Sequence, residues 1–255
     1  MPSLAVISLA GGVGRTTLAA TLAMLAAKRG RSSLAVDWDP QNLLALHFGA
    51  QRPPADGLAS HSAAGQPWQD SALRDADGAV VLPFGRLGVE QLRDWYPQMA
   101  RERGWLAAQL ALIERPASAW TFIDTPRAPS LLVEQALIAA DAALLVMRPD
   151  PGAVALLPQA LEVAGDRPVI AVLNGFDASR PLQQGVRAAL HKHLGARLVP
   201  HVVHRDEAVP EAFAHQGSLA DLAPHAQATH DFHGLLRWLG KRFDASVPAE
   251  SVDAD

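Results

Sequence analysis

A run of eight residues near the start of the chain has the composition of a loop that binds phosphate groups. Residues 10–17 read Ala-Gly-Gly-Val-Gly-Arg-Thr-Thr and stand between an apolar segment of strand length and a helical pattern. Glycines let the backbone curl until successive N–H groups point inward, and the dipole of the following helix adds positive potential there. A flexible glycine turn without a ligand is the alternative. The residues expected to contact the ligand are Gly11, Gly12, Val13, Gly14, Arg15, Thr16 and Thr17.

Carboxylates follow two further apolar segments. Asp-Trp-Asp-Pro at residues 37–40 follows the apolar run 33–36, and Asp124 follows the run 120–123. In open α/β sheets the carboxyl ends of parallel strands meet at one edge, where ligands bind. We expect Thr16, Asp39 and Asp124 to form a Mg²⁺ site, with Asp124 the stronger ligand and Asp39 also able to orient an attacking water. Each acid alone could be a helix or turn cap, but three motifs in this order argue against caps.

The apolar pattern predicts the elements that bring these motifs together. Strands are expected at residues 4–9, 33–36, 80–82, 120–123, 142–147, 169–173 and 198–199, and helices at 17–29, 89–114, 130–140, 153–164, 182–194 and 225–243. Strands that are apolar on both faces and separated by helices indicate an α/β fold: a mostly parallel central sheet with helices on both faces, in three layers.

Two stretches depart from this alternation. Residues 49–77 are rich in Pro, Gly, Ala, Ser and Asp, and we expect a surface excursion with a short helix near 68–74. Residues 244–255 mix Ser, Pro, Ala and acids, which predicts a disordered tail after a single domain of residues 1–243.

The overall composition excludes several classes of protein. The chain has 255 residues, 49% of them hydrophobic, which is enough for a large buried core. Its net charge of −4 argues against a protein whose main partner is nucleic acid. There is no cysteine, so disulfides and thiolate zinc sites are impossible. No segment reaches the roughly 18 uninterrupted apolar residues of a membrane span, and the N-terminus does not resemble a signal peptide. We therefore expect a cytoplasmic protein.

The three motifs resemble those of the ParA/MinD family of deviant Walker ATPases. They are Gly-Gly-Val-Gly-x-Thr-Thr at residues 11–17, Asp-x-Asp-Pro-Gln at 37–41 and Ile-Asp-x-Pro at 123–126. The resemblance covers nearly the whole chain and implies a P-loop NTPase fold, ATP and Mg²⁺ as cofactors and a homodimer that forms on ATP. It also implies that Asn174 reads the adenine edge and that Pro200 and His201 line the base. Asp39 and Arg15 would occupy the catalytic positions.

Three shorter segments resemble, more closely, the BcsQ family found in bacterial cellulose-synthesis operons. They are Leu-Pro-Phe-Gly at residues 82–85, Asp-Thr-Pro-Arg at 124–127 and His-Arg-Asp-Glu-Ala at 204–208. This resemblance implies a nucleotide-dependent dimeric switch or scaffold for the cellulose synthase secretion complex. Its partners would be a BcsR-like small protein and inner-membrane cellulose synthase components.

Two other functions remain open for a chain with these motifs. The first is a chromosome- or plasmid-partitioning ATPase, which would hold DNA through basic residues late in the chain. The late region is instead mixed and often acidic, so we expect no sequence-specific nucleic acid partner. The second is a P-loop enzyme that acts on a small metabolite, and we find no motif for an acceptor pocket. The acids of the late region are Asp206, Glu207, Glu211 and Asp221.

The phosphate loop departs from the ParA/MinD pattern at two positions. That family places one lysine that reaches across the dimer and a second that touches the β and γ phosphates, whereas this chain has Ala10 and Arg15. Arg15 keeps a charge in a bulkier, planar form. A cation supplied in trans is commonly worth about 10³ to 10⁵ in rate, so we expect slow or absent hydrolysis. Arg127 and Arg148 could replace the missing cation or could be ordinary surface arginines.

The last predicted helix allows two interpretations. Phe232, Leu235, Leu236, Leu239 and Phe243 fall on one face, with Arg237, Lys241 and Arg242 near its end. Such a helix could make peripheral contact with the inner membrane, or its apolar face could pack on the sheet, which we favour. Ten histidines include pairs at metal-ligand spacing, but the pairs fall in different elements and we expect no transition-metal site.

Overall fold

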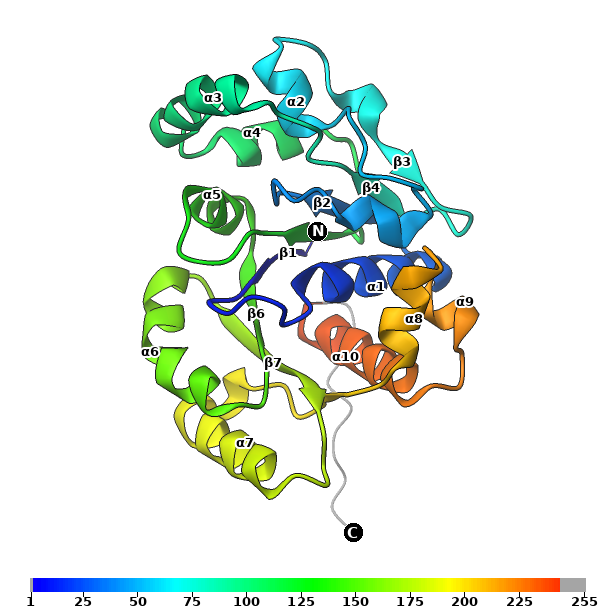
Figure 1. Cartoon of the computed structure of the whole chain (residues 1–255), viewed down its shortest axis with the longest axis vertical. Helices are drawn as coiled ribbons and strands as arrows, with labels where there is room; N and C mark the ends of the chain where they lie inside the picture. The colour runs from blue at the N-terminus through cyan, green and yellow to red at the C-terminus, as the bar shows by residue number, and fades with distance from the viewer. Residues whose placement is uncertain (1, 244–255) are drawn as a thin grey trace.

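The computed structural model describes residues 2–243, which form an α/β fold on one eight-stranded sheet (Figure 1). The strand order is β3-β4-β2-β5-β1-β6-β7-β8, and each neighbouring pair is parallel except β3 with β4. The predicted mostly parallel sheet is therefore confirmed, while the predicted tail 244–255 lies outside the described residues. The strands are β1 Ser3–Ile7, β2 Ser33–Asp37, β3 Leu73–Arg74, β4 Val80–Leu82, β5 Trp120–Asp124, β6 Ala142–Met147, β7 Val169–Phe176 and β8 Val203–His204.

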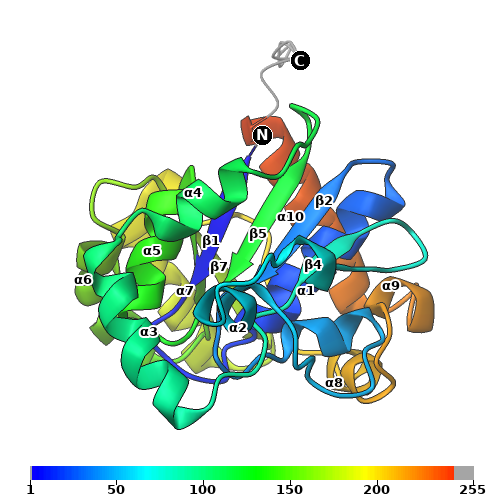
Figure 2. The same cartoon turned by 90° about the horizontal axis from the view of Figure 1, so that it is seen from above.

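Helices cover both faces of this sheet, as Figures 1 and 2 show. One hydrophobic core lies between the sheet and α2 to α7, and the other lies between the sheet and α1, α8, α9, α10 and η1. The helices are α1 Arg15–Lys28, α2 Leu58–Ala63, α3 Val89–Arg101, α4 Trp105–Ala111, α5 Leu131–Ala139, α6 Pro151–Ala164, α7 Pro181–Leu194, α8 Ala208–Ala214, α9 Leu219–Leu222 and α10 Gln227–Phe243. Three 3₁₀ helices complete the set: η1 Leu44–Phe48, η2 Gln69–Ser71 and η3 Gly195–Arg197.

The strand that leads to the phosphate loop shows why the sheet needs two helical layers. Leu4 and Val6 of β1 belong to the core under α1, whereas Ala5 and Ile7 belong to the core on the opposite face. Side chains alternate between the faces of a strand, so a strand that is apolar throughout must be covered on both sides. Helix α1 is itself buried from residue 18 to residue 27, which fixes the loop that precedes it.

Three predicted elements need correction. The helix expected at 89–114 is two helices, because α3 ends at Arg101 and α4 begins after Gly104. The helix expected near 68–74 is wrong in its extent: a short 3₁₀ helix, η2, is present at Gln69–Ser71, but β3 follows it, and the excursion also contains the unpredicted helix α2. The strand expected at 198–199 is also wrong. Leu198 forms one isolated bridge with Ala171, and the strand beside β7 is β8.

The last helix packs on the body of the protein. Phe232, Leu235 and Leu239 of α10 are fully buried in the core that also contains α1, and the Phe243 ring contacts the Trp120 ring edge-on at 5.9 Å. This apolar face is therefore not available to a membrane, and the interpretation of α10 as a packing helix is confirmed. None of the helices among residues 2–243 is long and apolar enough to cross a membrane.

The burial of α10 makes a quantitative prediction. Phe232→Ala should lower the free energy of unfolding by about 3–5 kcal/mol, because it removes a buried ring and leaves a cavity. Chemical denaturation measures this change, and the exposed Arg237→Ala on the same helix should stay within about 0.5 kcal/mol of the parent. Equal, small effects of both substitutions would contradict the packing of α10.

Candidate functional site

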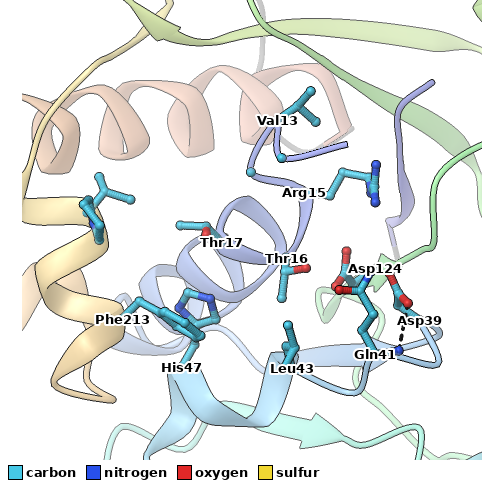
Figure 3. A pocket seen from close by; sticks show the side chains of 14 residues that line it. Val13, Arg15, Thr16, Thr17, Asp39, Gln41, Leu43, His47, Asp124 and Phe213 are labelled. Atoms are coloured by element: carbon cyan, nitrogen blue, oxygen red, sulfur yellow. Dashed lines mark hydrogen bonds between the residues drawn. The ribbon is translucent and has the colours of Figure 1, made fainter. Parts of the chain in front are cut away.

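The loop between β1 and α1 has the curled backbone that a phosphate-binding loop requires. Gly12 and Gly14 have φ angles of 66° and 90°, which residues other than glycine rarely adopt. The Gly14 carbonyl accepts a hydrogen bond from the Leu18 N–H at 2.9 Å, so α1 begins immediately after the loop. The loop borders a hollow of about 380 Å³ that Asp39 and Asp124 also line (Figure 3). The structure thus brings together residues 12–17 and both predicted metal ligands.

Asp124 is a buried carboxylate without a hydrogen-bond donor. Asp124 is the last residue of β5, and its side chain is 1% exposed. Neither carboxylate oxygen accepts a hydrogen bond of normal geometry from the described residues, although the Thr16 hydroxyl and the Thr125 N–H lie close enough to lower its pKa. Burial raises its pKa to about 7; the Thr16 hydroxyl and Arg15 lower this pKa, while Asp39 raises it. A buried, ionised carboxylate without a partner lowers the stability of the fold unless a cation pairs with it. Asp124 and the Thr16 hydroxyl therefore form a donor set that fits Mg²⁺, with its other positions left to phosphate and water.

The two aspartates that follow β2 have different tasks. Asp37 is fully buried, and its carboxylate accepts hydrogen bonds from the N–H groups of Asp39 at 3.1 Å and Leu44 at 2.9 Å. Burial, and then the nearby Asp124, raise the pKa of Asp37 well above its usual value. Asp37 thus fixes the loop that carries Asp39. Asp39 faces the hollow, where burial raises its pKa and the Gln41 N–H and Arg15 lower it.

Trp38, between these acids, points into an aromatic cluster. Its ring stacks on Trp105 at 5.7 Å and contacts Trp95 at 5.6 Å and Phe84 at 5.7 Å, measured between ring centroids. Trp105 and Trp95 come from α4 and α3, so the loop of Asp39 is packed against both helices. Aromatic pairs of this kind add to the stability that burial supplies.

Arg15 folds back onto its own loop. Its Nε donates to the Thr125 carbonyl at 2.9 Å, and its Nη1 donates to the Ala10 carbonyl at 3.0 Å. The guanidinium therefore links the start of the loop to the end of β5. Its charge lowers the pKa of both Asp39 and Asp124, and the side chain lines the hollow. Arg15 therefore supplies a cation beside the carboxylates.

The sequence comparisons identify the family. Residues 1–239 match the family described as cellulose biosynthesis protein BcsQ. The chain belongs to the BcsQ family. The cellulose biosynthesis protein BcsQ of Escherichia coli (strain K12) is 30% identical over 229 residues, which are 89% of this chain and 90% of that protein. The predicted BcsQ resemblance is thus confirmed.

This BcsQ-family chain is also similar to more distant relatives of the ParA and MinD type. The chromosome-partitioning ATPase Soj of Thermus thermophilus is 27% identical over 234 residues, covering 88% of this chain and 90% of Soj. The solved structure of the septum site-determining protein MinD with Mg-ADP, from Pyrococcus horikoshii OT3, has a TM-score of 0.75 at 20% identity. It covers 94% of this chain and 96% of that chain. The predicted P-loop NTPase fold is confirmed.

A small hollow borders the start of the phosphate loop in this BcsQ-family protein. Ala10 lines a space of about 60 Å³ together with Leu145, Met147, Leu156 and Arg148. Arg148 follows β6 and is exposed, as is Arg127 after β5. The structure therefore places a surface arginine, Arg148, on the same hollow as Ala10.

Asn174 lies against the phosphate loop. Its Nδ2 donates to the Val13 carbonyl at 2.7 Å, and an added Cβ on Gly14 would overlap the same amide. The predicted neighbourhood of Asn174 and the loop is therefore present. In this structure the amide nitrogen supports the loop, and the role of Asn174 in reading a base stays a prediction.

Pro200 and His201 follow the isolated bridge of Leu198 and lie outside the hollow that the phosphate loop borders. The Pro200 carbonyl accepts a hydrogen bond from Arg187 at 3.3 Å, and Pro200 lines a second hollow together with Phe176 of β7. His201 lies over Gly234 of α10. The role of both residues in lining a base stays a prediction.

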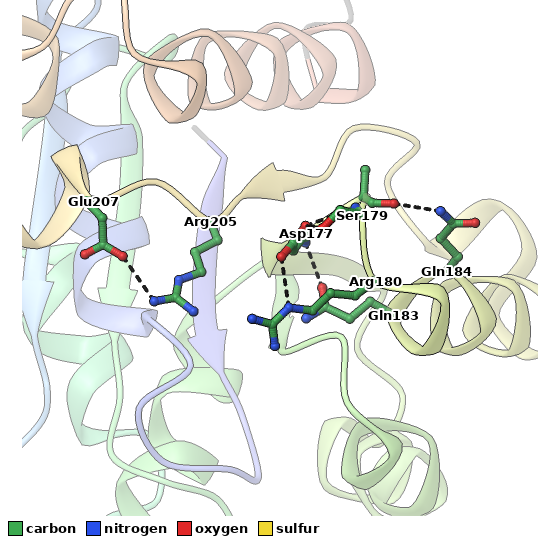
Figure 4. A network of polar contacts seen from close by, with 8 residues as sticks. Asp177, Ser179, Arg180, Gln183, Gln184, Arg205 and Glu207 are labelled. Atoms are coloured by element: carbon green, nitrogen blue, oxygen red, sulfur yellow. Dashed lines mark hydrogen bonds and ion pairs between the residues drawn. The ribbon is translucent and has the colours of Figure 1, made fainter.

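A charged rim beyond Asn174 was missed by the sequence reasoning. Asp177 accepts hydrogen bonds from Ser179 and Arg180, while Arg205 pairs with Glu207 at 3.1 Å (Figure 4). These contacts hold the pKa of Asp177 below its usual value, chiefly through Ser179. The side chains border a hollow next to His204, at the end of β7 and β8. The sequence signal was available, since residues 174–177 read Asn-Gly-Phe-Asp after a predicted strand.

One further lining residue, His47, has no signal in the sequence. Its ring lies 4.6 Å from the Phe213 ring of α8, at the end of the hollow opposite Asp39 (Figure 3). Burial lowers the pKa of His47 to about 4, so the ring is neutral at physiological pH. Among residues 2–243, no group of three histidine or acidic side chains is arranged to hold a metal ion.

Proposed function

We propose that this BcsQ-family protein binds ATP with Mg²⁺ and acts as a dimeric, nucleotide-dependent switch for the cellulose synthase complex. The observation that carries the proposal is the Asp124 carboxylate, buried without a donor beside Thr16 and the curled loop. A buried carboxylate without hydrogen-bond donors is typical of a site where a bound cation neutralises its charge. A related fold, MinD of Pyrococcus horikoshii, is described with Mg-ADP.

In this proposal the phosphates lie along the loop at the N-terminus of α1. The N–H groups of the loop and the Arg15 guanidinium would bind the β and γ oxygens, while Thr16 and Asp124 would hold Mg²⁺. Asp39 would bind Mg²⁺ through water or orient a water molecule at the γ-phosphate. Mg²⁺ would neutralise the phosphate charge, and the buried carboxylates would keep the metal in place.

The dimer would form on the face that carries the loop. Ala10 offers no charge to a partner, so Arg148 beside it is the candidate for a cation supplied in trans, with Arg127 the second candidate. The complex would sit at the cytoplasmic side of the inner membrane through partners, since the apolar face of α10 is buried. The partners we propose are a BcsR-like small protein and membrane components of the cellulose synthase.

Two measurements test the proposal. Light scattering of the purified protein should show a monomer alone and with ATP plus EDTA, and a dimer with ATP plus Mg²⁺. In the source organism, deletion of the gene should lower cellulose, and the wild-type gene but not an Asp124→Asn gene should restore it. Identical masses under all three conditions, or full restoration by the Asp124→Asn gene, would exclude a nucleotide-dependent switch.

Hydrolysis should be slow. We expect a turnover at or below about 10⁻² s⁻¹, because no lysine at position 10 can act across the dimer. A phosphate-release assay on the dimer measures this rate, and Ala10→Lys, which restores the family residue, should raise it. Turnover of the parent at rates typical of efficient P-loop enzymes, about 1–100 s⁻¹, would refute the expectation.

A further inference from the structure

One buried side chain ties together the loop that carries Asp39. Asn42 is 4% exposed, and its N–H donates to the Asp39 carbonyl at 2.9 Å. Its Nδ2 donates to the Pro54 carbonyl at 2.7 Å, and its Oδ1 accepts from the Phe84 N–H at 3.1 Å and the Gly85 N–H at 3.4 Å. The amide therefore joins three segments that are far apart in the sequence.

The backbone of Asn42 is as specific as its side chain. Its φ angle is 54°, in the left-handed region that asparagine tolerates better than most residues. This turn closes the loop so that the Gln41 N–H reaches the Asp39 carboxylate at 2.9 Å. Asp37 fixes the same loop from its other end through the N–H groups of Asp39 and Leu44. The Asp39 carboxylate is thus oriented from both sides.

The two segments that Asn42 contacts are themselves fixed. The Leu58 N–H donates to the Pro83 carbonyl at 2.9 Å, and the Arg86 N–H donates to the Ala55 carbonyl at 2.8 Å. Gly57 lies so close to residues 83–85 that an added Cβ would overlap their backbone. Asn42 therefore anchors the Asp39 loop to two segments that hydrogen bonds hold together.

We propose that Asn42 is the positioning residue of Asp39. Asn42 does not line the phosphate-loop hollow; it lines a separate hollow on the outer side of the loop, with Arg52, Pro54 and Arg86. It can therefore act on a bound metal or phosphate only through the loop that it holds, and its N–H binds the carbonyl of Asp39, the residue of that loop with a carboxylate at the hollow. This inference rests on the proposed role of Asp39 at the Mg²⁺ site.

A double-mutant cycle tests this dependence. The Mg²⁺ concentration that half-saturates binding of a fluorescent ATP analogue is measured for the parent, Asn42→Ala, Asp39→Ala and the double variant. Asn42→Ala should raise this Mg²⁺ concentration about tenfold relative to the parent, which is the scale of a lost buried hydrogen bond. In the Asp39→Ala background, the same substitution should leave the Mg²⁺ concentration unchanged. An equal rise in both backgrounds would show a merely structural role, and no rise in the parent would overturn the proposal.

Two further variants separate positioning from general destabilisation. Asn42→Gly keeps the left-handed turn but removes the side-chain hydrogen bonds, so it should match Asn42→Ala in Mg²⁺ dependence. Gln135→Ala removes a comparably buried amide, which accepts from Leu106 N–H at 3.1 Å and donates to the Met99 carbonyl at 2.9 Å. This control should lower stability and leave Mg²⁺ dependence unchanged; a shift equal to that of Asn42→Ala would overturn the proposal.

The outcomes also separate this inference from the proposed function. No Mg²⁺-dependent ATP binding by the parent protein would refute the proposed function itself. Normal binding by the parent, with no change in Asp39→Ala, would refute the positioning role alone.

Discussion

Replacement of Asp124 by asparagine should abolish Mg²⁺-dependent nucleotide binding and, at the same time, stabilise the ligand-free protein. The carboxylate is buried without a donor, so its charge is unfavourable until a cation binds. Loss of a direct ligand should weaken Mg²⁺-dependent ATP affinity at least about 100-fold. Calorimetric titration with ATP in Mg²⁺ and in EDTA measures the first effect, and thermal or chemical unfolding measures the second.

The stability gained by Asp124→Asn should increase with pH. The pKa of Asp124 in the folded protein is about 7, above the ordinary value of 3.8, so the folded state binds its proton more tightly than the unfolded state. Asp124 therefore lowers the free energy of unfolding little near pH 4 and increasingly as the pH rises toward 7. Above pH 7 this destabilisation stays constant. Each pKa unit is about 1.4 kcal/mol, so Asp124→Asn should gain about 1–4 kcal/mol of stability at pH 8 and less at pH 5.

Mg²⁺ binding should follow the same titration. The metal must displace the proton of Asp124, so Mg²⁺ affinity of the parent should rise from pH 5.5 to about 7 and change little above it. A stability difference between the parent and Asp124→Asn that stays constant from pH 5 to 8 would contradict a pKa of Asp124 near 7.

Replacement of Gly14 by alanine should be the second large effect. Gly14 has a φ angle of 90°, and an added Cβ would overlap the Asn174 amide that donates to the Val13 carbonyl. Alanine must therefore either strain the backbone or push Asn174 off the loop. We expect a loss of about 2–4 kcal/mol in the free energy of unfolding and at least about 100-fold weaker ATP binding.

A second glycine provides the matched control for Gly14→Ala. Gly185 lies within α7, where an added Cβ meets no atom within 4 Å. Gly185→Ala should stabilise the helix by up to about 1 kcal/mol and leave ATP binding unchanged. Denaturation and ATP titration of both variants check the pair. A Gly14→Ala protein with the stability and ATP affinity of the parent would contradict the close contact with Asn174.

Much of this site could be predicted because its residues are adjacent in the sequence or follow strand ends. The bounds of β4 and β6 were predicted to the residue, since β6 is an apolar run between Asp141 and Arg148, and β4 is a short apolar run that ends at Pro83. The phosphate loop, Asp39 and Asp124 were placed at one sheet edge for the same reason. These are local signals, and parallel topology then brings them together.

The residues that were missed depend on partners that sequence patterns do not show. Asn42 binds backbone groups of Pro54, Phe84 and Gly85, and any residue types there would offer the same N–H and C=O groups. β8 has only two residues, so its position is set by pairing with β7 rather than by an apolar run.

The aromatic cluster beneath Asp39 gives the protein a built-in optical signal. Trp38 lies directly between Asp37 and Asp39, and its indole stacks on Trp105 while touching Trp95 and Phe84. Any shift of the Asp39 loop on metal or nucleotide binding must move this indole within its stack. Tryptophan emission, with Trp38→Phe as the reference, can therefore report the state of the loop without an attached dye.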